Sequence, residues 1–369
     1  MTTCVTHVPS IQYGEALSSF LLRLARNHSA SGHELCTLLW PRFQFWTRDI
    51  DRTASDALLD EVAQVTALSR DVLERATLRK VVKAMGFREW IHGCQRGILP
   101  IGVYHRVRRR FGQQYCPECL AEKPAYLRKL WRIEFMMACP RHKILLRDSC
   151  PICDAPFIPH RNHALTKAQC HRCGSSLTTG ASAKPSDAAA KLQQTALAAL
   201  TNSLDDTPPA MGTSATDGFG WPVFADAGNA AFLDGVHRLC RLAARASDAL
   251  PHVSGRSRIW TLLRTPERAE VMTRVGHWLS GWPDEWVRWA GIADMTQHYL
   301  EDEYGPLPDW IKSATTQLSY SHGSVNILRP RQKLSFRQLH TEHKSVAAYR
   351  QARASLLLKK AGVLSEKRE

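Results

Sequence analysis

The chain has 369 residues, enough for two or three domains with hydrophobic cores of their own. Its formal net charge of +15 favours polyanionic partners such as nucleic acid. The sequence contains no run of eighteen apolar residues, and its N-terminus lacks the charged-then-apolar order of a secretory signal. We therefore expect a soluble cytoplasmic protein without a membrane segment.

The basic residues gather in two stretches. Residues 79–147 hold 16 Lys/Arg against 4 Glu, and residues 320–369 hold 11 Lys/Arg against 3 Glu. Clustering on this scale is typical of surfaces that contact phosphates, and the alternative is a solvated basic surface without a ligand.

Helical periodicity dominates the N-terminal part. Residues 13–27 place Leu17, Phe20, Leu21 and Leu24 on one helical face. Shorter helical patterns cover 55–67 and 69–76, each preceded or opened by a serine that can cap the helix. Several short helices followed by a basic stretch are compatible with a helix-turn-helix type of fold.

Beyond residue 178 the pattern changes twice. Residues 178–218 are rich in Thr, Ala, Ser, Pro and Gly around a helical run at 187–200, and helical patterns return at 228–245 and 266–295. The tail 344–360 predicts a basic amphipathic helix. Four close tryptophans, Trp278, Trp282, Trp286 and Trp289, have spacings that favour a helical core face over a stacking platform for bases.

Four metal-type pairs stand between these two parts. They are Cys116 with Cys119, Cys139 with His142, Cys150 with Cys153, and Cys170 with Cys173. Two intervening residues form a tight turn that directs both side chains to one ion, so eight ligands predict two tetrahedral zinc ions. Pairing of sequential knuckles is the simplest arrangement, and an interleaved one, which pairs the first knuckle with the third and the second with the fourth, is left open by the spacing.

The zinc ions are expected to be structural, because four protein ligands leave no coordination position for water. Cys4, Cys36, Cys94 and Cys240 lie outside the knuckles and are expected to be small core residues. Spare histidines such as His160, His163, His340 and His343 are weaker ligand candidates. Phosphate-loop, nucleophile-elbow and zinc-protease motifs are absent and acidic residues are sparse, so we expect a non-enzymatic protein.

These patterns together resemble the TniQ/TnsD family of transposition target-selection proteins. The resemblance rests on Pro9 followed by YGEALSSFLLRLA, on the ordered knuckles CPEC, CPRH, CPIC and CHRCG, on Trp131 between the first two knuckles, and on LSGWPDEW downstream. It covers about residues 10–175 well and 230–290 more loosely. Ala16 and Phe20 stand where serine and tryptophan are frequent in the family.

The resemblance implies a mainly α fold with small β zinc-ribbon modules. We predict an N-terminal helix-turn-helix-like domain over 1–113 and tandem zinc modules over 114–177. A linker region with one helix then covers 178–229, and a C-terminal helical domain with a basic tail covers 230–369.

The resemblance also implies a non-enzymatic adaptor in DNA transposition. Such proteins link a target-recognition complex, either a CRISPR RNA-guided effector or attachment-site DNA, to an AAA+ ATPase that recruits the transposase, and some act as homodimers. We expect Arg106, Arg108, Arg109 and Arg110 to contact nucleic acid, with a solvated helix end as the alternative. The chain is short for a reader of a long attachment site, which favours docking on another target-bound complex in the bacterial nucleoid.

Two other functions fit the same residues. A stand-alone zinc-containing transcription regulator would use a helix such as 104–111 to read base edges directly. A zinc-dependent nuclease would need clustered carboxylates, and it predicts DNA cleavage in the presence of divalent metal.

Overall fold

The computed structural model describes residues 5–87, 95–101, 110–161, 168–201, 228–246, 259–293, 295 and 306–318. By its internal contacts the chain forms two units, residues 1–321 and 322–369. The second unit lies outside the described residues, so the fold below is that of the first. It is mainly helical, as the sequence predicts.

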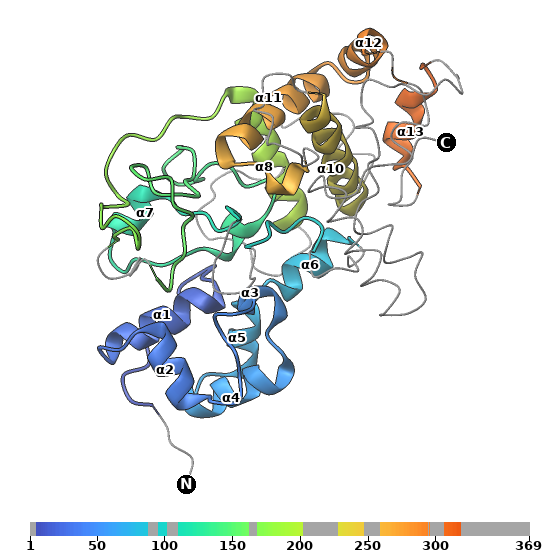
Figure 1. Cartoon of the computed structure of the whole chain (residues 1–369). Helices are drawn as coiled ribbons and strands as arrows, with labels where there is room; N and C mark the ends of the chain where they lie inside the picture. Colours follow the sequence, from blue (N-terminus) through green and yellow to red (C-terminus); the bar gives the residue numbers. More distant parts are fainter. Residues whose placement is uncertain are drawn as a thin grey trace, which may run out of the picture. The chain divides into compact units, whose positions relative to one another are not determined.

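The described residues of the N-terminal part contain six helices (Figure 1). They are α1 (Leu17–Asn27), α2 (Gly32–Leu39), α3 (Ile50–Thr53), α4 (Asp56–Thr66), α5 (Arg70–Arg75) and α6 (Arg79–Met85). The predicted serine caps are confirmed, because Ser55 and Ser69 accept hydrogen bonds from the third backbone N–H of α4 and α5. Helix α2 was not predicted from the sequence, although Ser31 and Glu34 form a capping box at its start.

A first hydrophobic core contains residues from all five helices α1 to α5. The predicted face of α1 is fully buried in it, with Leu17, Phe20, Leu21 and Leu24 at 0% exposure. A second core begins at Leu78 in the turn before α6 and extends through the cysteine region to Leu318. The domain boundaries predicted from the sequence stay predictions.

The cysteine region has little regular structure. It contains the short helix α7 (Pro117–Ala121) and the 3-10 turn η1 (Lys129–Arg132). Its β structure among the described residues consists of isolated bridges, four of which flank the cysteine knuckles. The four bridges are Tyr115 with Arg147, Ala138 with Leu145, Ser149 with Pro156, and Gln169 with Ser176.

Helices return after the cysteine region. They are α8 (Asp187–Thr201), α10 (Asn229–Arg245), η2 (Trp260–Leu262), α11 (Thr265–Ser280), α12 (Asp284–Ile292) and α13 (Asp309–Thr315). Helices α8, α10 and α11 pack against one another (Figure 1). A Cβ on Gly276 of α11 would lie 2.5 Å from the carbonyl oxygen of Ala188, so this glycine permits the close approach of α8. The helix predicted within the linker region is therefore part of the second core.

The helical pattern predicted over 266–295 is broken in the structure. Helix α11 ends at Ser280, and α12 begins only at Asp284. The intervening residues include Pro283, whose ring removes the N–H that a continuous helix would need. The four tryptophans are thus divided between two helices and the turn that joins them.

Residues 125–132 attach the cysteine region to the N-terminal helices. The backbone N–H of Ala16 donates to the carbonyl of Leu127 at 2.9 Å, and that of Lys129 donates to the carbonyl of Gly14 at 2.9 Å. Gly14 has a φ of +66°, a left-handed conformation that glycine adopts without strain. The two segments therefore meet along their backbones.

The buried carboxylate of Glu15 organises this attachment. It accepts hydrogen bonds from the backbone of Gln12 at 2.9 Å, from Ser19 at 2.8 Å and from Arg23 at 2.7 Å. Ser19 in turn accepts one from the backbone N–H of Leu127 at 2.9 Å. Burial raises the pKa of Glu15. The motif YGEALSS thus specifies the junction between the two parts as well as the start of α1.

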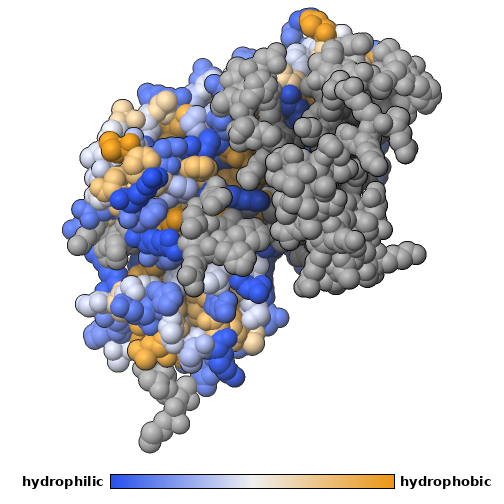
Figure 2. Space-filling view, viewed as in Figure 1, coloured by the Kyte–Doolittle hydropathy of each residue, from blue (hydrophilic) through white to orange (hydrophobic). Residues whose placement is uncertain are grey.

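The described part of the chain contains no helix that is long and apolar enough to cross a membrane. Figure 2 shows hydrophilic and hydrophobic residues interspersed on one face of this part. Its exposed large apolar side chains are Tyr13, Leu38, Ile152, Ile259 and Ile292.

Candidate metal centres

The structure brings the eight predicted ligands into two groups, in the sequential order of their knuckles. The first group contains Cys116, Cys119, Cys139 and His142, and the second contains Cys150, Cys153, Cys170 and Cys173. Within each group the ligand atoms lie within 4.8 Å of one another. Each group could hold one metal ion, and the interleaved alternative does not match this arrangement.

The donor atoms of the first group have tetrahedral spacing. Nδ1 of His142 lies 3.3 Å from Sγ of both Cys116 and Cys119 and 3.6 Å from Sγ of Cys139. Zinc bonds of about 2.3 Å to sulfur and about 2.0 Å to nitrogen separate neighbouring donors by roughly 3.5–3.8 Å. The observed distances fit one ion at the centre.

Three of the four knuckles share one backbone turn. In each, the residue after the second ligand has a left-handed φ: 55° at Lys143, 54° at Asp154 and 72° at Gly174. Its N–H donates to the carbonyl of the first ligand at 2.8, 3.0 and 2.9 Å, respectively. This hydrogen bond closes the turn that points both ligands of a pair to the same side.

The first knuckle uses a helix instead. Cys116 is the N-cap of α7, Pro117 opens the helix and Cys119 lies in its first turn. Residues three apart on a helix share a face, so both thiols point the same way. Proline suits the first helical position because its missing N–H would have no partner there.

Acidic residues orient His142 from outside the first group. Nε2 of His142 lies 3.1 Å from Oε1 of Glu122, while its Nδ1 faces the three sulfurs. Arg141 donates to the other oxygen of Glu122 at 2.5 Å, and Glu118 lies further away at 3.8 Å. A proton on Nε2 leaves Nδ1 free as a ligand, so Glu122 selects the tautomer that binds metal.

The second group is more open to solvent. Its sulfur pairs Cys150 with Cys173 and Cys153 with Cys170 are each separated by 3.6 Å. Cys173 is exposed and Cys153 half-buried, whereas all three cysteines of the first group are buried. The backbone N–H groups of Ile152 and Arg172 point to Sγ of Cys150 and Cys170 at 3.5 and 3.4 Å. Such donors stabilise thiolates.

The crowded thiols of the first group cannot all ionise without a cation. Hydrogen bonds from Cys116 and Cys119 lower the pKa of Cys139 below its ordinary value. The pKa of Cys119 is raised far above its ordinary value by its hydrogen bond with Cys116, then by that with Cys139 and by burial. A divalent ion removes this competition for protons among the three thiols, because it stabilises every thiolate that binds it.

Side chains of the helical part hold the knuckles in place. Oε1 of Gln193 on α8 accepts hydrogen bonds from the backbone N–H groups of Met137 and Ala138 at 2.9 and 2.8 Å. Its Nε2 donates to the carbonyl of Ala138 at 3.0 Å. Arg147 donates to carbonyls of the segment that follows the last knuckle, including that of Thr179 at 2.6 Å. The pattern of cysteines gave no indication of these contacts.

The arginines predicted to contact nucleic acid are only partly described. Arg106, Arg108 and Arg109 lie outside the described residues, as does the basic tail. Arg110 is half-buried and has an interaction partner. The prediction therefore stays open.

The cysteines outside the knuckles agree with the core prediction where the structure describes them. Cys36 and Cys240 are buried in the two hydrophobic cores, and Cys4 and Cys94 lie outside the described residues. His160 stacks on Trp46, with ring centroids 5.0 Å apart, and belongs to neither ligand group. His163, His340 and His343 lie outside the described residues.

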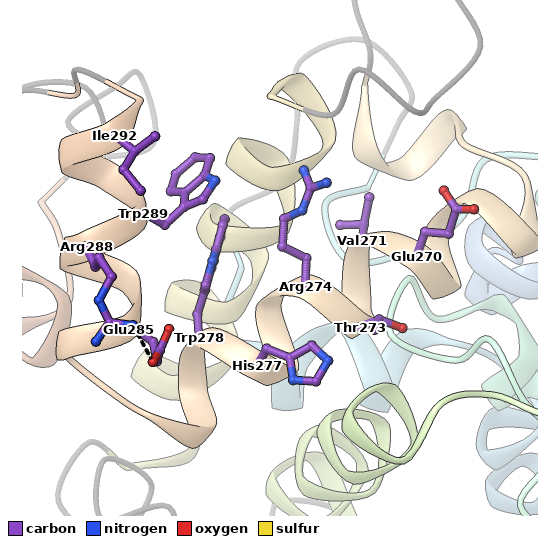
Figure 3. A pocket seen from close by; sticks show the side chains of 10 residues that line it. All are labelled: Glu270, Val271, Thr273, Arg274, His277, Trp278, Glu285, Arg288, Trp289 and Ile292. Atoms are coloured by element: carbon purple, nitrogen blue, oxygen red, sulfur yellow. Dashed lines mark hydrogen bonds and ion pairs between the residues drawn. The ribbon is translucent and has the colours of Figure 1, made fainter.

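A groove of about 600 Å³ separates α11 from α12. Its wall includes Trp278 and Trp289, whose ring centroids are 4.4 Å apart (Figure 3). Trp278 and Trp286 are buried, which agrees with the core prediction, whereas Trp282 and Trp289 are half-buried. Ile292 at the end of the groove is 82% exposed, and Arg288 donates to Glu285 at 2.7 Å.

These observations define a mainly helical protein with one Cys₃His group and one Cys₄ group that could each hold a metal ion. The TniQ family model matches residues 7–146, which include the Glu15 motif and the first ligand group. This match assigns that part of the chain to the TniQ family, and the resemblance stated from the sequence is confirmed. The TniQ domain points to a role as an adaptor in transposition. No curated protein matches the chain.

Proposed function

We propose that this protein is a non-enzymatic adaptor that selects the target of a DNA transposon. It links a target-recognition complex, either a CRISPR RNA-guided effector or attachment-site DNA, to an AAA+ ATPase that recruits the transposase. The observation that carries the proposal is the TniQ match over residues 7–146. The protein would act at the nucleoid.

The metal in both ligand groups is proposed to be Zn²⁺. Cys₃His and Cys₄ donor sets with tetrahedral spacing suit zinc better than magnesium or calcium, which prefer oxygen ligands. Four protein donors complete the coordination of each ion, so zinc would stabilise the fold and would not activate water. This closed coordination supports the adaptor over a zinc-dependent nuclease.

The first experiment is capture of the tagged full-length protein from cells that carry its own genomic neighbourhood. Co-purified proteins are identified, and bound nucleic acid is sequenced. An ATPase together with guide RNA and effector subunits supports the RNA-guided form of the adaptor, and an ATPase with a single DNA site supports the attachment-site form. One DNA site without an ATPase would overturn the adaptor in favour of a transcription regulator, and metal-dependent DNA cleavage would favour a nuclease.

The second experiment tests the arginines proposed to contact nucleic acid. Glutamine replaces Arg106, Arg108, Arg109 and Arg110 together, and the charge-matched control replaces the exposed Arg26, Arg42, Lys184 and Arg288. Each lost phosphate contact should reduce the slope of log affinity against log salt concentration by about 0.7–0.9. Equal slopes for the two variants would show that these arginines do not form a specific contact surface.

A further inference from the structure

Arg264, at the start of α11, donates hydrogen bonds to three side chains that flank Cys150 and Cys153 of the second ligand group. Its Nε donates to Asp148 at 3.0 Å, and its Nη2 donates to Ser149 at 2.6 Å. Nη1 and Nη2 donate to the two oxygens of Asp154 at 3.1 and 2.8 Å. The guanidinium thus forms a bidentate ion pair with Asp154 and additional hydrogen bonds to Asp148 and Ser149. Lysine does not reproduce this geometry.

The three acceptors directly flank two of the proposed metal ligands. Asp148 and Ser149 precede Cys150, and Asp154 follows Cys153. Asp154 is also the left-handed residue of this knuckle, and its N–H donates to the carbonyl of Cys150 at 3.0 Å. Arg264 therefore holds the knuckle on both sides of its metal-binding turn.

Arg264 and the residue after it, Thr265, together attach the start of α11 to the rest of the cysteine region. Thr265 donates its backbone N–H to Asp148 at 2.7 Å and its hydroxyl to Gln114 at 2.8 Å. The guanidinium of Arg264 also lies over the ring of Phe111, 3.9 Å from its centre. One side chain thus joins the second knuckle pair, the first turn of α11 and the segment that leads to the first knuckle.

We propose that Arg264 couples retention of the metal ion in the second site to the docking of α11. A bound ion fixes Cys150 and Cys153, and it thereby fixes the positions of Asp148 and Asp154 that Arg264 needs. Docked α11 in turn holds those residues and keeps the knuckle closed around the ion. Such a coupling is reciprocal, since each event must favour the other by the same factor. The proposal depends on the proposed metal binding at the second site.

The first site provides an internal control. Its ligands receive no side-chain hydrogen bond from Arg264, and its orienting residues Glu122 and Arg141 form their own pair. A change at Arg264 should therefore alter the second site selectively. A general loss of folding would affect both sites.

The test measures zinc release from the full-length protein to a chromogenic chelator. Cys139→Ser and Cys173→Ser variants assign the two release phases to the first and second sites. In Arg264→Gln and in Asp154→Asn, which keeps a residue tolerant of left-handed φ, release from the second site should be about tenfold faster. First-site release should be unchanged. Arg288→Gln, in an exposed pair on α12, is the matched control and should behave as wild type.

The reciprocal arm measures hydrogen exchange in Cys173→Ser. The amide of Arg268, bonded to the carbonyl of Arg264 at 2.9 Å, should exchange faster than in the wild type. Second-site release at the wild-type rate in Asp154→Asn, or unchanged exchange at Arg268 in Cys173→Ser, would overturn the coupling. If the wild-type protein holds two zinc ions and the variants show neither effect, only the proposed coupling is overturned. If the wild-type protein holds fewer than two zinc ions, the proposed zinc binding is overturned as well.

Discussion

Nη2 of Arg132 lies 2.5 Å from Oδ2 of Asp49, and the arginine side chain is completely buried between the cysteine region and the N-terminal helices. Nη1 of the same arginine donates to Oδ1 of Asp49 at 3.1 Å, and Asp51 lies 3.7 Å away. Arg132 also donates to the carbonyl of Leu99 at 2.8 Å. One guanidinium thus lies beside two neighbouring carboxylates and joins segments 83 residues apart in the sequence.

Arg132→Met should strongly destabilise the protein. The substitution leaves Asp49 and Asp51 close together without the buried guanidinium of Arg132, and removal of one partner from a buried pair costs about 3–5 kcal/mol. Urea unfolding measures this loss. Arg288→Met, in an exposed pair, should cost less than about 1 kcal/mol. Similar values for the two variants would show that the buried pair has no special role.

Cys139→Ser should remove one of two bound metal ions and lower the melting temperature. Cys139 belongs to the first ligand group, and structural zinc binding contributes directly to the free energy of folding. Metal content measured by atomic emission, together with thermal unfolding, tests this. Cys240→Ser changes a buried cysteine outside both groups and should retain two ions. Equal metal content in the two variants would contradict the assignment.

Glu122→Gln should weaken metal binding at the first site without abolishing it. The amide cannot accept the Nε2–H of His142 as strongly as the carboxylate does, and loss of such outer contacts typically costs about 10–100-fold in metal affinity. Competition with a chelator of known affinity measures the change. Glu285→Gln, in an exposed pair on α12, serves as the control and should match the wild type. An unchanged first-site affinity in Glu122→Gln would rule out the orienting role.

The exposed carboxylate of Asp56 should make folding stability depend on pH under acidic conditions. Its hydrogen bond with Arg79, and then its attraction to Arg79 and Arg70, lower the pKa of Asp56. Because the folded-state pKa is the lower one, the stabilisation is present above the unfolded-state pKa of about 3.9 and is lost as pH falls through the folded-state value. The stability difference between wild type and Asp56→Asn should therefore shrink below about pH 4.

A second variant checks the cause of this pH dependence. Arg79→Gln removes the main partner of Asp56 and should reduce the acid-dependent stabilisation in the same pH range. Equilibrium unfolding at a series of pH values measures both variants. A difference between wild type and Asp56→Asn that stays constant down to the lowest pH would contradict the pairing.

The two candidate ligand groups were predictable because the spacing within each knuckle is local. Two residues between ligands are enough to form a metal-binding turn, so Cys150 and Cys153 can be paired from spacing alone. The caps Ser55 and Ser69 were predictable for the same reason, since each bonds an N–H three residues ahead. The resemblance to the TniQ family likewise rests on short motifs, such as Pro9 followed by YGEALSSFLLRLA.

The helix break at Pro283 and the packing of α8 were harder to predict. Apolar spacing continues through residues 266–295, and periodicity does not report where a chain reverses. The Ala-rich composition near α8 is compatible with a linker. Only the folded structure shows that α8 packs closely against Gly276 of α11.

The contacts that connect the parts of the protein arise only when distant segments meet. Arg132 and Asp49 are 83 residues apart, and Arg264 and Asp154 are 110 apart. Nothing in the spacing of a basic and an acidic residue at such separations distinguishes a buried pair from two solvated charges. The local motifs therefore specify the two candidate ligand groups, and the choice of partners for buried charges depends on desolvation, which exists only once the chain has folded.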